Sequence, residues 1–132
     1  MRENYFWLNE TDFGIGEIQF RKNELEGKLT LEINASREIT ERISADEQAE
    51  FGWLLYPPQL YFRDVPISQT LGLKQFRVDE QLLDEYDVAL YMLEHYNIVG
   101  IAELTATTFA FTGCAQLDDA EVRVVISCLL PS

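Results

Sequence analysis

Apolar and polar residues alternate along residues 27–34, where Leu29, Leu31 and Ile33 are separated by polar positions. An alternation with a period of two places the three apolar side chains on one face of a half-buried strand. Residues 16–21 show the same alternation, and the polar connector between the two segments ends at Gly27. We therefore expect an antiparallel hairpin over residues 16–34.

The last third of the chain contains three further segments rich in Val, Ile, Thr and Phe, at residues 98–104, 107–115 and 121–129. Only short polar turns separate them, which leaves no room for helices that would connect parallel strands. These segments are expected to form an antiparallel meander.

Residues 51–66 are rich in aromatic side chains and contain the pair Pro57-Pro58. Because proline cannot donate a hydrogen bond to a neighbouring strand, the segment is expected to form two extended pieces that meet at a bend. Most of its aromatic side chains should lie in the core. Trp53 and Tyr61 are candidates for exposed binding anchors, since an aromatic side chain desolvates a large area with little loss of rotamer freedom.

Two segments allow more than one interpretation. Residues 36–50 fit a short edge strand or a brief helix, and we favour a helical turn with Ser44 as its N-cap, followed by a strand. Residues 79–95 fit one helix capped by Asp79, with an apolar stripe on one side. They also fit a loop over 79–85 followed by a strand over 86–94 that is buried on both faces. The strands that follow favour the second interpretation.

These elements predict a mainly β protein, an antiparallel sandwich or strongly curved sheet with one short helix. The alternative is an α+β fold with a helix at 79–95. A chain of 132 residues is expected to form a single domain over 1–132, because this size supports one independent hydrophobic core.

Acidic residues dominate the charge, with 23 Asp and Glu against 10 Lys and Arg and a formal net charge of -13. A surface this negative repels phosphate backbones and anionic lipids, so neither nucleic acid nor a membrane is expected as a partner. A basic protein surface would complement it, although acidity also serves solubility alone. The first residues lack the apolar run of a signal peptide, which favours a cytoplasmic location. Cys114 and Cys128 lie in apolar segments and are expected to be reduced.

His95 is the only histidine, which argues against paired-histidine metal sites and most Ser-His or Cys-His relays. We therefore expect no catalytic residue, no metal site and no cofactor, and we interpret His95 as a turn residue. Acidic residues cluster at 79–87 and at 118–121, and neither cluster has the spacing of a calcium-binding EF-hand loop. They fit a solvated face or an interface that attracts a cationic partner. The residues predicted to bind that partner are Asp79, Glu80, Asp84, Glu85, Asp87, Tyr91, Glu94, Trp53 and Tyr61.

Small size, heavy acidity and strand-rich patterning occur here together with the segments Ala49-Glu50-Phe51-Gly52-Trp53-Leu54-Leu55-Tyr56-Pro57-Pro58 and Asp84-Glu85-Tyr86-Asp87-Val88-Ala89-Leu90-Tyr91. In this general character the chain resembles the cytoplasmic immunity proteins of bacterial polymorphic and contact-dependent toxin systems. The resemblance implies stoichiometric inhibition, in which the chain covers the active site of a basic toxin. An acidic interaction or adaptor module without catalytic activity is the alternative, and an enzyme or small-ligand carrier is a third hypothesis. The oligomeric state stays open.

Overall fold

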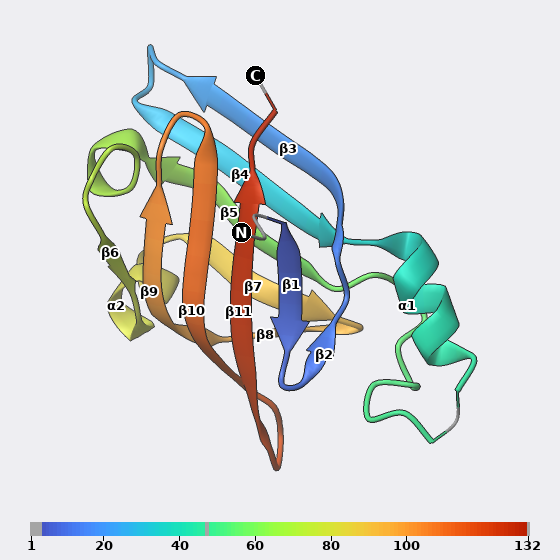
Figure 1. Cartoon of the computed structure of the whole chain (residues 1–132). Helices are drawn as coiled ribbons and strands as arrows, with labels where there is room; N and C mark the ends of the chain where they lie inside the picture. Colours follow the sequence, from blue (N-terminus) through green and yellow to red (C-terminus); the bar gives the residue numbers. More distant parts are fainter. Residues whose placement is uncertain (1–3, 47, 132) are drawn as a thin grey trace.

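Two antiparallel sheets pack face to face in the computed structural model, which describes residues 4–46 and 48–131 (Figure 1). The six-stranded sheet has the order β2 (Thr11–Asp12), β1 (Tyr5–Leu8), β11 (Glu121–Leu129), β10 (Thr108–Gln116), β9 (Ile98–Leu104) and β6 (Phe76–Val78). The five-stranded sheet has the order β3 (Ile15–Asn23), β4 (Lys28–Ala35), β5 (Gln59–Pro66), β7 (Asp87–Met92) and β8 (Glu94–Tyr96). Helices α1 (Arg37–Ser44) and α2 (Glu80–Glu85) and the 3-10 turn Ile67–Gln69 connect strands. The predicted β-sandwich is confirmed.

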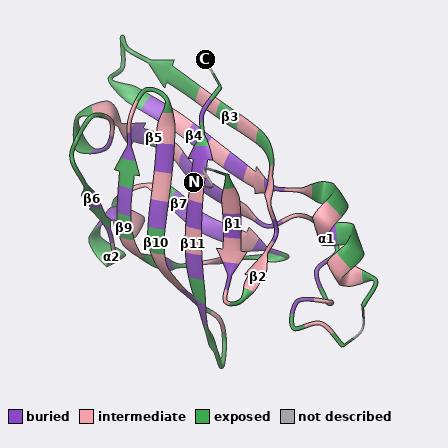
Figure 2. Cartoon of the chain, viewed as in Figure 1, coloured by how far each residue is buried: buried purple, intermediate pink, exposed green. Residues whose placement is uncertain are grey.

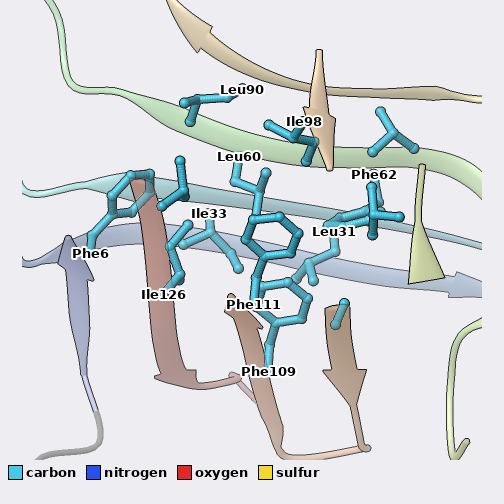
Figure 3. Close-up of a cluster of buried hydrophobic side chains, with 14 of the residues drawn as sticks. Phe6, Leu31, Ile33, Leu60, Phe62, Leu90, Ile98, Phe109, Phe111 and Ile126 are labelled. Carbon is cyan, nitrogen blue, oxygen red and sulfur yellow. The ribbon is translucent and has the colours of Figure 1, made fainter. Parts of the chain in front are cut away.

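The core lies between the two sheets. Along β4, buried residues alternate with half-buried ones, as Figure 2 shows by colour. The ring of Phe62 from the five-stranded sheet meets the rings of Phe76 and Phe109 from the other sheet edge to face, at centroid distances of 6.0 and 5.7 Å. Figure 3 shows side chains of both sheets in this core, with Leu60 and Phe62 from the five-stranded sheet and Phe109, Phe111 and Ile126 from the six-stranded one. The period of two in the sequence of β4 thus reflects burial on one face of that strand.

The hairpin and the meander form where the alternation predicts them. Strands β3 and β4 pair over the predicted hairpin, and β9, β10 and β11 pair in succession. The observed bounds of β9, β10 and β11 differ from the predicted ones by at most one residue.

Two predictions before β5 are wrong. Helix α1 begins after Ser36, whose Oγ accepts a hydrogen bond from Ile39 N at 3.3 Å, so Ser44 is the last helical residue and not the N-cap. Among the described residues, no strand lies between α1 and β5. Residues 48–53 instead form successive turns, and Ala49 N donates to Asp46 O and Gly52 N to Ala49 O. Only the second of the two extended pieces predicted in 51–66 exists, as β5.

Both interpretations of 79–95 are correct in part. Asp79 caps α2, since its Oδ1 accepts hydrogen bonds from Gln81 N and Leu82 N, but the helix ends at Glu85. A strand follows at β7, as favoured, and the chain turns at Leu93 with a φ of 70° into β8. The single helix over 79–95 is wrong because Val88, Leu90 and Met92 belong to the core face of a sheet that can bury them only as a strand.

The two cysteines are free and lie on opposite faces of the six-stranded sheet. Cys128 pairs with the buried Phe109 and is itself buried, whereas Cys114 pairs with the exposed Arg123. Burial raises the pKa of the Cys128 thiol to about 12.

This buried thiol makes stability fall at high pH. Above the pKa of about 9 of an unfolded cysteine, the unfolded chain loses the proton that the folded chain keeps. The contribution to folding is therefore complete below that pH and decreases by up to about 1.4 kcal/mol per pH unit until the folded pKa is reached. Urea unfolding at a series of pH values should show this decrease in the wild type and a shallower one in Cys128→Ala. An equal pH dependence of the unfolding free energy in the two proteins would contradict this prediction.

Candidate functional site

The outward face of the five-stranded sheet carries a network of interacting polar and aromatic side chains. Alternate residues of β4, β5 and β7 point away from the core, and register brings them into rows across the strands. The outward residues on these strands are Thr30, Glu32, Asn34, Gln59, Tyr61, Arg63, Asp87, Ala89 and Tyr91. We call this surface the outer face.

Arg63 is the centre of the network. Its Nε donates to Glu32 Oε2 at 2.8 Å, and its Nη2 donates to Gln59 Oε1 at 3.3 Å. Its Nη1 lies 3.6 Å from Asp87 Oδ2. The guanidinium also stacks 3.8 Å above the centroid of the Tyr61 ring. Four neighbours on three strands therefore hold the arginine in one orientation, which lowers the entropy lost when a ligand meets it.

Tyr61 is buried beneath Arg63, with only 3% of its surface exposed, so the prediction that it is an exposed anchor is wrong. Its partner across the strands is Ala89, whose small side chain lets the phenol extend over β7. The hydroxyl lies 2.7 Å from Nδ1 of His95 on β8. Burial and the negative charge of Asp87 raise the pKa of Tyr61, which keeps the hydroxyl neutral as a hydrogen-bonding group.

His95 lies in β8 and not in a turn. Its ring packs against both Tyr61 and Tyr91, at centroid distances of 5.8 and 5.1 Å. It borders an open hollow of about 710 Å³ that also contains Glu94 and Asp118. The residues that line this hollow in the described structure include no Ser, Thr, Cys or Lys that the imidazole could activate as a nucleophile.

A groove with aromatic walls lies at the end of the outer face where β5 begins. Its volume is about 460 Å³, and Tyr56, Pro57, Gln59, Tyr91 and Arg37 are among its lining residues. We call it the aromatic groove. Tyr91 and Gln59 lie side by side in this lining because they are register partners on β7 and β5.

The segment that leads into the aromatic groove exposes large apolar side chains. Phe51 and Leu54 are buried, and Phe51 packs against Phe13, which anchors the segment. The residues between and after these anchors point outward, and the exposed fractions are 43% for Trp53, 71% for Leu55 and 57% for Tyr56. Trp53 is exposed, as predicted.

The structure divides the predicted partner-binding residues among four places. Asp79, Glu80, Asp84 and Glu85 belong to α2 and its cap, at the side of the sandwich where β6 and β7 lie. Asp87, Tyr61 and Tyr91 belong to the outer face. Glu94 lies beyond the far end of β7, beside Asp118 in the hollow next to His95. Trp53 lies in the segment after α1, which Figure 1 shows on the opposite side from α2.

Sequence reasoning missed Arg63, Glu32 and Tyr56. The only available signal for Arg63 was the alternation of Gln59, Tyr61 and Arg63 on the outward positions of one strand. Within the described part of the chain, no three His, Cys, Asp or Glu side chains are grouped so that they could hold a metal ion. No helix in that part has the length and apolarity needed to cross a bilayer.

Comparison with protein-family models, with curated proteins and with solved structures found no match.

Proposed function

We propose that this chain is a cytoplasmic protein-binding domain that inhibits a basic protein by covering it, in the manner of an immunity protein against its toxin. The observation that carries the proposal is the aromatic groove with its exposed flank. Trp53, Leu55 and Tyr56 expose large side chains on the segment that leads into the groove, and Tyr56 and Tyr91 line it. Tyrosine and tryptophan dominate the binding energy of protein interfaces, and a groove lets them enclose a partner side chain.

The ordered network beside the groove favours binding over catalysis. Side-chain hydrogen bonds link Arg63 to Gln59 and Gln59 to Asn34. Asn34 in turn donates to Glu17 O at 3.0 Å. These side chains are already fixed before a partner arrives, so binding costs little further ordering. The excess of acidic residues elsewhere on the surface would attract a basic partner over long distances.

The test uses the product of the gene adjacent to the one that encodes this chain. We expect its expression alone to stop bacterial growth and co-expression of this chain to restore it, with a stable complex of the two purified proteins. Tyr56→Ala with Tyr91→Ala should weaken that complex by more than about tenfold, because tyrosine side chains that line a groove are expected to contribute much of the binding energy. Val99→Ala is the matched control, since Val99 on the six-stranded sheet is 55% exposed, close to the 57% of Tyr56.

Two results would overturn the proposal. In one, the adjacent gene product neither harms growth nor binds the chain. In the other, the double tyrosine variant and Val99→Ala bind equally well, which would exclude the aromatic groove as the contact surface.

A further inference from the structure

A second groove, at the other end of the outer face, has the opposite charge to the molecule as a whole. It measures about 360 Å³ and lies where the β3–β4 hairpin meets the end of β5. Four basic residues line it, Arg21, Lys22, Lys28 and Arg63, against two acidic ones, Glu32 and Asp64. We call it the cationic groove. It gathers four of the ten Lys and Arg residues of a chain whose net charge is -13.

A β-bulge shapes this groove. Leu29 pairs with Val65 and Leu31 with Phe62, so Arg63 and Asp64 both lie opposite Thr30. Asp64 has a φ of 53°, and its N–H donates to Thr30 Oγ1 at 3.0 Å. A bulge turns side chains away from the regular alternation, and bulges with left-handed residues other than glycine are concentrated at functional sites. The bulge places Arg63 at the border between the central network and the groove.

Two of the four cations in the groove are available to a ligand. Arg63 is bound to Glu32, whereas Arg21 and Lys28 form no ion pair among the described residues. Lys22 pairs with the buried Leu29, so its side chain belongs to the other face of the hairpin. Arg21 pairs with Thr30 and Lys28 with Asn23, which puts the two cations at diagonal positions on one face of the hairpin. Like charges at neighbouring positions repel each other. An anion bound between them would remove that repulsion.

We propose that the cationic groove binds a short acidic segment of a partner protein in an extended conformation. The groove follows two strands, so a chain lying along it would present its carboxylates to cations on both strands. Carboxylates form charge-assisted hydrogen bonds with Arg and Lys, and the Asn23 and Thr30 side chains supply further polar groups. The molecule is acidic as a whole and would carry one groove that binds acidic segments. Binding at this groove does not depend on the inhibition proposed above.

A nucleic acid fits the same groove less well. None of the residues that line it is aromatic, so unpaired bases would have no stacking surface. The acidic remainder of the molecule would also repel a long polyanion, whereas a segment with a few carboxylates experiences mainly the local field.

The experiment titrates the folded chain with a short fluorescein-labelled peptide of alternating glutamate and serine at low ionic strength. We expect saturable binding, with amide chemical-shift changes concentrated at residues 21–30 and 63–64. Arg21→Gln with Lys28→Gln should weaken binding by about tenfold or more, since charge-assisted hydrogen bonds are removed. Arg42→Gln on α1 with Arg77→Gln on β6 removes the same charge outside both grooves, at two exposed positions, and should weaken binding by less than about twofold.

Each remaining outcome overturns the proposal. Absence of saturable binding, or equal binding of a glutamine-serine peptide, means that the groove does not select carboxylates. Equal losses of peptide affinity in the two double variants mean that the peptide responds only to the net charge of the chain and not to the groove. Tighter binding of oligothymidylate than of the glutamate peptide, at the same residues, assigns the groove to nucleic acid instead.

Discussion

Replacing Gly113 by alanine should destabilise the domain by on the order of 4 kcal/mol or more, at the extreme of single substitutions. Gly113 in β10 lies directly opposite Gly100 in β9. A Cβ at Gly113 would lie 2.1 Å from Val99 O, 2.7 Å from Gly100 Cα and 2.8 Å from Cζ of Phe111. The first two contacts are with backbone, so the strands would have to separate, and the fully buried ring of Phe111 would have to move.

Urea unfolding of Gly113→Ala beside Gly27→Ala measures this effect. Gly27 has a φ of 68° with nothing within 4 Å of its added Cβ, so its replacement should cost only the left-handed conformation, about 1–2 kcal/mol. A cost for Gly113→Ala no greater than that for Gly27→Ala would show that β9 and β10 tolerate a side chain at their closest approach.

The fold could be predicted where burial leaves a periodic trace over many residues. Strands β3, β4 and β9 to β11 have seven to nine residues each, long enough for alternation or a β-rich composition to be recognised. Strands β2, β6 and β8 have two or three residues and exist because a neighbour pairs with them, so their own sequence carries no period. The prediction misplaced helix α1 because Ser44 is a residue type that often caps helices, whereas the cap in the structure is Ser36.

The candidate site could be predicted only in part, because it depends on pairing between distant strands. Tyr61 and His95 meet across 34 residues, and β7 lies between their strands in the sheet. The net charge of the whole chain predicts a basic partner, but it does not show where the few basic side chains lie in the fold. Their meeting in the cationic groove requires the register of β3, β4 and β5 and the bulge at Asp64. Trp53 could be recognised from its residue type and its place before the double proline.

Reversing two charges on α2 should slow association with a basic partner by about tenfold or more at low salt, if the acids there guide its approach. Asp84 and Glu85 are exposed, and neither forms an ion pair among the described residues. Asp84→Lys with Glu85→Lys should leave folding intact, because the Asp79 cap is unchanged and lysine at the end of a helix interacts favourably with its dipole. The protein identified in the growth assay serves as the partner, and stopped-flow fluorescence measures the association rate.

Salt and a matched variant separate local guidance from overall charge. Near 0.5 M salt the Debye length falls to about 4 Å, so the double reversal should then change the association rate little. Asp118→Lys with Asp119→Lys makes the same change in net charge at the exposed turn between β10 and β11. If the association rate falls much less in this variant than in the α2 variant, the partner approaches near α2 and the adjoining outer face. Asp87, which follows α2, belongs to that face and lies 3.6 Å from Arg63. Equal slowing by both variants would mean that net charge alone attracts the partner, and an unchanged rate in both would mean that its surface is not basic.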